Sequence, residues 1–134
     1  MEAEGYQALA EQFIAFLQAG SAPAGLFQPN VFLDLTTPQW RQQVQGAEEL
    51  VGVRKRSHPA LGTVPRWRWD PTPTGFVIEF EEQWEDRGGT WYCREMARAD
   101  VTDGAISNLS IYCTGDWDPA LQQRHGREVA LLRP

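Results

Sequence analysis

The chain has 134 residues, a formal net charge of −6 and an isoelectric point near 4.8. This length suits one domain, residues 1–134, which can bury a hydrophobic core without disulfides. The negative charge argues against nucleic acid and anionic membranes as partners.

The first residues, MEAEGYQALAEQ, hold neither the basic segment nor the apolar segment of an export signal. No window of the sequence approaches the length of an apolar membrane span. The two cysteines lack the spacing of metal ligands and fit a reducing compartment. We therefore expect a cytoplasmic protein that does not enter the membrane.

Periodicity in the first half of the chain predicts two helices with a short strand between them: 4–19, 31–35 and 47–58. The first helix is expected to end at Gly20, and a turn or short helix covers 22–28. Gly46 opens the second helix and Pro59 ends it.

After Pro59 the pattern changes to that of strands, and we expect four of them: 63–70, 76–85, 90–101 and 105–114. The segments DPTPTG, DRGG and TDG separate them and have the composition of hairpin turns. Asp118 followed by Pro119 is typical of a helix start, so a last helix begins there. Helices followed by an antiparallel meander indicate an α+β fold.

A two-residue loop at Gly88-Gly89 would place Glu82 directly opposite Glu95 on the apolar face of the sheet. The other face would then carry Glu79 opposite Arg98, and this match of opposite charges favours the register.

The TDG turn allows two registers. A two-residue loop would put Leu109, Ile111 and Cys113 on the charged face, whereas a three-residue loop puts them on the apolar face. We adopt the three-residue loop, which places Cys93 opposite Cys113. The two cysteines are then either a redox pair or small core hydrophobes.

The pairing of Glu82 with Glu95 is the sharpest chemical feature of the sequence. Two carboxylates about 5 Å apart repel by about 3 kcal/mol at an effective dielectric constant of 20. One of them should hold its proton near neutral pH, as acid–base catalysis requires. The alternative is that both are solvated or paired with Arg54.

Two further residues are candidates for the same chemistry. His58, on the apolar side of the second helix, either acts as a base or caps the last turn. Asp116 either lies with Tyr112 at a pocket mouth or caps a turn that Trp117 closes. With only two histidines and no phosphate loop, we expect no metal and no cofactor.

The segments FIAFLQAG, LF, VFLDL and QGAEEL, followed by a long meander, resemble the nuclear transport factor 2-like superfamily, which includes SnoaL-like and ketosteroid isomerase-like proteins. The resemblance covers nearly the whole chain and implies a single SnoaL-like domain. Its fold would be a cone, in which a curved antiparallel sheet wraps over N-terminal helices, as in cystatin-like folds. A mostly apolar pocket would open at one end.

The resemblance does not carry over the catalytic residues of the isomerases. Their oxyanion tyrosine, general base and second acid would fall on Phe13, Leu35 and either Ala97 or Arg98, and none matches. The RAD motif at 98–100 resembles that of epoxide hydrolases of the superfamily, but it is expected to face outward. Asp116 lies near the late aspartate of the polyketide cyclase-like members.

We therefore expect a domain that binds a small apolar or aromatic molecule and forms a homodimer through its outer sheet face. If it is an enzyme, the reaction is an isomerisation, cyclisation, dehydration or hydrolysis, with Glu82, Glu95, His58 and Asp116 as catalytic residues. The expected binding residues are Phe13, Phe16, Trp40, Trp67, Trp84, Leu109, Ile111 and Tyr112. The alternative is a non-catalytic binding or dimerisation module.

Overall fold

A computed structural model describes residues 2–134. Within this range three helices are present: α1 (Ala3–Ala19), α2 (Ala47–Ser57) and α3 (Pro119–Glu128). Seven strands form one sheet: β1 (Phe27–Thr37), β2 (Trp40–Gln45), β3 (Gly62–Thr63), β4 (Trp67–Thr72), β5 (Gly75–Asp86), β6 (Gly89–Thr102) and β7 (Ala105–Cys113). The α+β prediction is confirmed.

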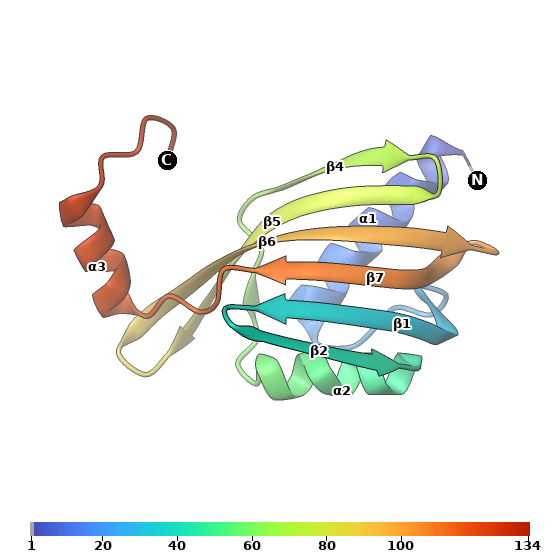
Figure 1. Ribbon diagram of the computed structural model, residues 1–134, viewed down its shortest axis with the longest axis horizontal. Helices are drawn as coiled ribbons and strands as arrows, with labels where there is room; N and C mark the ends of the chain where they lie inside the picture. The colour runs from blue at the N-terminus through green and yellow to red at the C-terminus, as the bar shows by residue number, and fades with distance from the viewer. Residues whose placement is uncertain (1) are drawn as a thin grey trace.

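Helix α1 lies along one face of the sheet, and α2 lies beside β1 and β2 (Figure 1). The apolar stripe of α1 is buried, with Phe13 fully buried and Phe16 nearly so. Gly20 ends the helix at φ 76°, and its N–H donates to the carbonyl oxygen of Phe16 at 2.9 Å. Glycine suits this left-handed position because it has no Cβ to clash.

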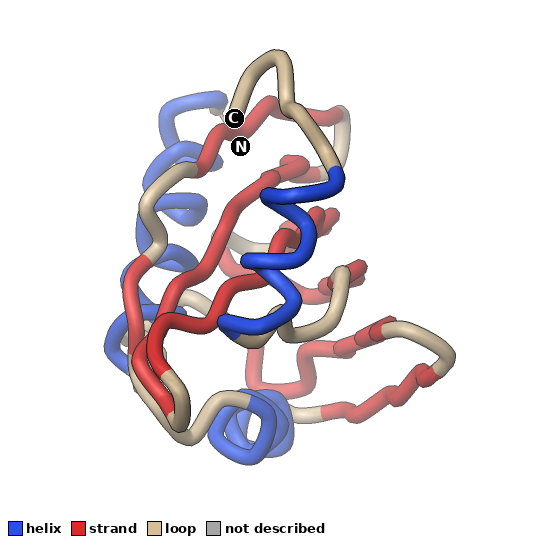
Figure 2. The backbone as a smooth tube through the Cα atoms, turned by 90° about the vertical axis from the view of Figure 1, so that its left-hand side faces the viewer, coloured by secondary structure: helices blue, strands red, loops and turns tan. Residues whose placement is uncertain are grey.

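The sheet is mixed and open, with strand order β2-β1-β7-β6-β5-β3, and β4 also pairs with β5. Strand β1 runs parallel to β7, whereas the other pairs are antiparallel. The sheet curves over α1, as Figure 2 shows from the side. The buried core residues lie between this concave face and the helices. The expected cone is therefore confirmed, with one parallel pair that the sequence did not reveal.

The first strand is longer than predicted, and β2 was missed. Pro38 and Gln39 form the two-residue turn of a β1–β2 hairpin, with Gln39 at φ 60°. The residues of β2 are mainly polar, and this edge strand lacks the apolar alternation that marks a buried strand.

The β5–β6 hairpin differs from its predicted register by two residues. Asp86 pairs with Gly89, so Glu82 lies opposite Cys93 and Glu95 lies opposite Phe80. The predicted direct pairing of Glu82 with Glu95 is wrong, and the two are diagonal neighbours instead. A shift by two keeps every side chain on its face, which is why the apolar face itself was predicted correctly.

The charged face follows the same correction. Across the β5–β6 hairpin the residue that lies directly opposite an arginine is Glu81, which pairs with Arg94, whereas Glu79 lies opposite Met96. Glu79 forms its ion pair with Arg68 on β4, and the predicted match with Arg98 is wrong because Arg98 faces Val77.

The TDG turn is a two-residue loop, contrary to our prediction, with Asp103 at φ 51° and Gly104 at φ 81°. A bulge follows, between the pairs Asp100–Asn108 and Val101–Ile106. The extra residue of β7 returns the later side chains of that strand to the apolar face. Cys113 therefore faces the core side as expected, but it lies opposite Glu95 and not opposite Cys93.

Helix α3 lies at one end of the molecule, away from α1 and without a buried residue (Figure 1). It begins as predicted, because the Asp118 carboxylate accepts a hydrogen bond from Leu121 N at 2.8 Å. Trp117, just before it, exchanges two backbone hydrogen bonds with Tyr92, at 3.1 and 2.7 Å. None of the helices described for residues 2–134 has the length and hydrophobicity of a membrane crossing.

Candidate active site

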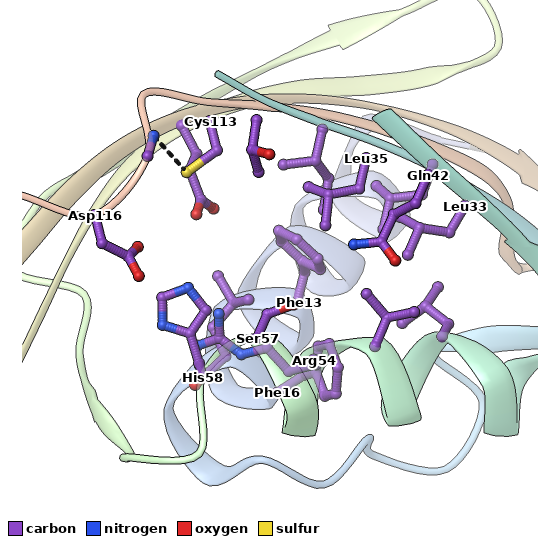
Figure 3. Close-up of a pocket in the computed structure, with 18 of the residues that line it drawn as sticks. Phe13, Phe16, Leu33, Leu35, Gln42, Arg54, Ser57, His58, Cys113 and Asp116 are labelled. Carbon is purple, nitrogen blue, oxygen red and sulfur yellow. Dashed lines mark hydrogen bonds between the residues drawn. The ribbon is translucent and has the colours of Figure 1, made fainter. Parts of the chain in front are cut away.

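A cavity of about 370 Å³ opens on the concave side of the sheet, between α1, α2 and strands β1 and β7. Its volume is within the range of small-molecule sites. Most of the wall is hydrophobic and consists of Phe13, Phe16, Leu17, Leu33, Leu35, Leu50, Val53, Leu109 and Ile111. The polar side chains gather mainly at one end, and they are Arg54, Ser57, His58, Glu95, Cys113 and Asp116 (Figure 3).

Separate elements bring these polar groups together. The end of α2 supplies Arg54 and His58, β6 supplies Glu95, and the last residue of β7 supplies Cys113. Asp116 follows in the loop after β7, where Gly115 has a positive φ of 82° that redirects the chain. The predicted position of Asp116 at the end of the last strand therefore brings it to the cavity.

Arg54 and Glu82 form a buried ion pair at the base of this polar end. Both terminal guanidinium nitrogens of Arg54 donate to the Glu82 carboxylate, at 2.5 and 3.1 Å, and one also donates to the Leu17 carbonyl at 2.8 Å. Burial acts to raise the pKa of Glu82, but the bonds from Arg54 outweigh it and the net shift is downward. Glu82 is thus an ionised, structural partner of Arg54 rather than part of the cavity wall.

Glu95 has the opposite character. Burial, followed by the neighbouring Glu82 carboxylate, raises its pKa well above the ordinary value. Its Oε1 lies 3.4 Å from the Sγ atom of Cys93. A carboxyl group facing the cavity and protonated near neutral pH can donate a hydrogen bond or a proton to a ligand.

His58 and Asp116 are at the cavity mouth. The Asp116 carboxylate is directed toward the imidazole of His58 (Figure 3). Burial lowers the pKa of His58, and the attraction of Glu82 only partly offsets it, so the ring is neutral near pH 7. Partial burial raises the pKa of Asp116. A neutral imidazole is able to accept a proton.

The ring of Trp84 supports that of His58. The two rings pack edge to face with centroids 4.7 Å apart, and Trp84 is itself buried. Trp84 therefore contacts His58 but does not line the cavity. Its predicted place in the cavity wall is wrong.

The two cysteines are free and face the same side of the sheet. Cys93 is fully buried, and its neighbours Cys113, Glu95 and Glu82 raise its pKa together with burial. Cys113 lines the cavity and accepts a hydrogen bond from Gly115 N at 3.3 Å. The predicted direct opposition is wrong, because Cys113 faces Glu95 across the ladder.

One group of side chains could be considered for a metal ion. Donor atoms of His58, Glu82, Cys93 and Glu95 lie within 4.8 Å of one another. The guanidinium of Arg54 already occupies both oxygens of Glu82 and supplies a positive charge there. The donor set is thus arranged for an ion pair, and a metal would have to displace Arg54.

The expected binding residues divide into two groups. Phe13, Phe16, Leu109 and Ile111 line the cavity. Four others do not, and they are Trp40, Trp67, Trp84 and Tyr112. Tyr112 is 61% exposed and belongs to the outer face, whereas Trp67 packs against the core from β4. Trp40 is 69% exposed at the start of β2, on the same face of that strand as Gln42 but outside the cavity wall.

The motif at 98–100 lies away from the cavity, as expected. The side chain of Arg98 is 62% exposed, with its Nε atom 3.9 Å from Asp100 Oδ1. An epoxide hydrolase-type site therefore gains no support from these residues.

Sequence reasoning missed Cys113 and Gln42 as polar cavity residues and treated Arg54 only as an alternative partner of the glutamates. For Arg54 the signal was available, because it lies on the same helical face as Leu50 and Val51. Gln42 could not be found, since its strand was not predicted. Its amide projects into the cavity from β2 (Figure 3).

The fold has clear relatives among solved structures. An NTF2-like protein from Anabaena variabilis superposes with a TM-score of 0.68 at 17% identity, covering 87% of this chain and 94% of that one. A candidate polyketide cyclase from Xanthomonas campestris pv. campestris gives 0.66 at 18% identity, covering 94% and 98%. A candidate ketosteroid isomerase from Kribbella flavida gives 0.59 at 19% identity, covering 87% and 82%.

These likenesses show that the chain has the nuclear transport factor 2-like fold, in agreement with the resemblance read from the sequence. No protein-family model matches the chain. No curated protein matches it either. Because the identities are low, the comparisons establish the fold, and the chemistry has to be argued from the site.

Proposed function

We propose that this protein is an acid–base enzyme acting on a small, mainly apolar molecule that carries a carbonyl group. The observation that carries the proposal is that a carboxyl, Glu95, and an imidazole, His58, line the same end of an apolar cavity, where burial raises the pKa of Glu95 and lowers that of His58. An acid and a base that both hold the required protonation state at neutral pH are what enolisation needs.

Each polar group has a role in this proposal. Glu95 donates a hydrogen bond to the carbonyl oxygen and stabilises the charge that develops there. His58 removes a proton from the adjacent carbon, and Asp116 stabilises the imidazolium that results. Glu82 holds Arg54 in place through their ion pair. The positive charge of Arg54 lies near Glu95 and His58, and Arg54 takes no part in the proton transfer.

The apolar wall gives the substrate its class. Phe13, Phe16 and Leu109 present hydrocarbon and aromatic surface, so binding comes mainly from burial of apolar area. Two of the similar folds come from a candidate polyketide cyclase and a candidate ketosteroid isomerase, and their names are compatible with carbonyl chemistry. The same wall favours isomerisation or cyclisation over hydrolysis, since a hydrolytic site has to admit water.

Exchange of carbon-bound hydrogen tests the proposal directly. 2-Tetralone, a small aromatic ketone, is incubated with the protein in D₂O, and loss of its α-proton signal is followed by NMR. We expect exchange above the buffer rate, and a fall of roughly 10²-fold or more in the His58→Gln variant.

Matched controls are available for both residues. His125, on exposed α3, is the other histidine, and His125→Gln should leave exchange unchanged. Glu48 is exposed on α2, and Glu48→Gln controls for Glu95→Gln. If the wild type binds the ketone but exchanges no faster than buffer, the enzyme is ruled out for this substrate class and the binding module remains.

A second proposal concerns the outer face of the sheet. Met96 and Tyr112 are 48% and 61% exposed and lie directly opposite each other on β6 and β7, on the face away from the cavity. An exposed patch of large apolar side chains on a sheet supports a homodimer contact. Tyr112→Glu should convert a dimer to a monomer in sedimentation, and a wild-type monomer at micromolar concentration would contradict the proposal.

The location of the protein is part of the same proposal. Two neighbouring cysteines, Cys93 and Cys113, are free thiols rather than a disulfide. This arrangement favours a reducing compartment such as the cytoplasm.

A further inference from the structure

The proton transfer proposed above leaves one reactive side chain of the cavity without a role. Cys113 lies at the end of β7, half-buried, and its Sγ faces the cavity (Figure 3). Gly115 N donates to this sulfur at 3.3 Å, and the strand register places Cys113 opposite Glu95. A thiol next to a carboxyl that can supply a proton is an arrangement for addition chemistry.

The two cysteines differ in what surrounds them. Hydrogen bonds from Cys93 and from the Gly115 N–H lower the pKa of Cys113 to about 7, although burial opposes them. An ordinary thiol has a pKa of about 8.5, so a larger share of Cys113 is thiolate at neutral pH. The pKa of Cys93 is raised, and this fully buried thiol is inert.

We propose that Cys113 is a covalent nucleophile that adds to the β-carbon of an α,β-unsaturated carbonyl compound held in the cavity. This inference rests on the proposed function, since it assumes that the carbonyl oxygen lies near Glu95. It narrows the substrate class from carbonyl compounds in general to conjugated enones. It also assigns chemistry to a residue that the acid–base mechanism does not use.

The step balances within the site. The Cys113 thiolate forms an S–C bond to the β-carbon while the π-electrons of the C=C bond move toward the carbonyl oxygen. The Glu95 carboxyl transfers its proton to the resulting enolate and becomes a carboxylate, so the total charge stays at minus one. In the reverse step the proton returns to Glu95, the C–S bond breaks, and the thiolate leaves.

The surroundings favour an enone over an acyl donor. The apolar wall around Leu109 and Ile111 can hold a flat conjugated hydrocarbon. Reversible addition turns the double bond into a single bond, which can rotate before the thiolate departs. An isomerisation follows from these residues alone, without any further reactant.

The test uses benzylideneacetone, an aromatic enone, with the full-length protein. Intact mass spectrometry and peptide mapping should find one adduct, at Cys113 and not at Cys93. The rate should saturate with enone concentration and rise with a midpoint near pH 7. Free N-acetylcysteine, as the reference thiol, should show no saturation and a midpoint near its own pKa of about 8.5.

Variants separate the contributing groups. Cys113→Ser and Cys113→Ala should abolish the adduct, with circular dichroism confirming that each is folded. Cys93→Ser should keep the adduct, and any change in its pH midpoint reports on the Cys93 hydrogen bond. Glu95→Gln should slow addition at saturating enone.

Binding of benzylacetone, the saturated analogue, distinguishes a failure of the Cys113 inference from a failure of the proposed acid–base function. If the analogue binds and 2-tetralone exchanges its proton, but Cys113 stays unmodified or reacts without saturation, this inference is wrong and the proposed function stands. Preferential labelling of Cys93 also overturns it. If the wild type neither binds the analogue nor catalyses exchange, the proposed function fails, and the inference fails with it.

Discussion

The two ends of the cavity are built on different principles. At the apolar end, Phe13 and Phe16 are buried and pack on other aromatic rings, with Phe13 edge to face on Phe80 at 5.7 Å. At the polar end, the pKa values of Glu95, His58 and Cys113 are shifted from those of the same groups in water, upward for Glu95 and downward for the other two. The apolar end stabilises the fold. The polar end keeps ionisable groups buried with shifted pKa values, and the free energy that this costs is offset by the rest of the fold.

The largest effect is expected at the apolar end. Phe13→Ala should lower the free energy of unfolding by about 3–5 kcal/mol, because it removes a fully buried ring and leaves a void. Urea denaturation measures the loss. Leu121→Ala on α3, where the side chain is 42% exposed, should change stability by less than about 0.5 kcal/mol. A similar loss of unfolding free energy in both variants would mean that the apolar end of the cavity does not stabilise the fold more than the exposed helix α3 does.

The ion pair beneath the polar end should come next. Glu82→Ala should cost about 3 kcal/mol of unfolding free energy, because it leaves the Arg54 guanidinium buried without its carboxylate. Glu79→Ala on the other face of β5 is the control, since its exposed pair with Arg68 should be worth less than about 1 kcal/mol. Equal losses would contradict the assignment of Glu82 as a structural residue.

A pH-dependent effect should distinguish Glu95 from Glu82. The raised pKa of Glu95 means that the folded protein keeps a proton that the unfolded chain loses near pH 4.3. Wild-type stability should therefore fall as pH rises from that value to the folded pKa, by up to about 1.4 kcal/mol per pH unit. Glu95→Gln should remove this contribution, so its stability relative to wild type should increase with pH. A constant difference across the range would show that Glu95 is ionised in the folded protein.

The smallest effect should appear in binding alone. Leu35→Ala removes part of the cavity wall on β1 and should weaken binding of 2-tetralone by about 1 kcal/mol. The exchange rate at saturating ketone should stay close to that of wild type, because His58 and Glu95 are untouched. A large fall in that rate would show that the apolar end also positions the substrate.

The same contrast explains what the sequence could predict. The fold and the apolar face followed from periodicity, and they survived two errors of register because a shift by two residues keeps each side chain on its face. The loop of the β5–β6 hairpin could not be fixed, because Gly88 and Gly89 both have a positive φ and either fits the turn. The pairing of Cys113 with Glu95 depends instead on the Asp103-Gly104 loop and on a bulge in β7.

The polar end was predicted only in part. Glu95, His58 and Asp116 come together at the cavity, while Glu82 is withdrawn from it by Arg54. The predicted repulsion between Glu82 and Glu95 is present in the protein. The ion pair of Arg54 with Glu82 decides that Glu95, and not Glu82, has the raised pKa. No propensity or spacing encodes that choice, because it depends on the meeting of α2 with β5 in three dimensions.

The bond between Arg54 and Glu82 also sets the charge balance of a reaction cycle. Before reaction the interior holds one cation and one anion, with Glu95 and His58 neutral. In the proposed enolisation one proton reaches His58 while a negative charge develops on the carbonyl oxygen beside Glu95, so the interior remains electroneutral throughout. No ion has to enter or leave the low-dielectric region. The catalyst returns to its starting state when His58 gives the proton back to carbon, and part of a deuterium label should then stay with the product.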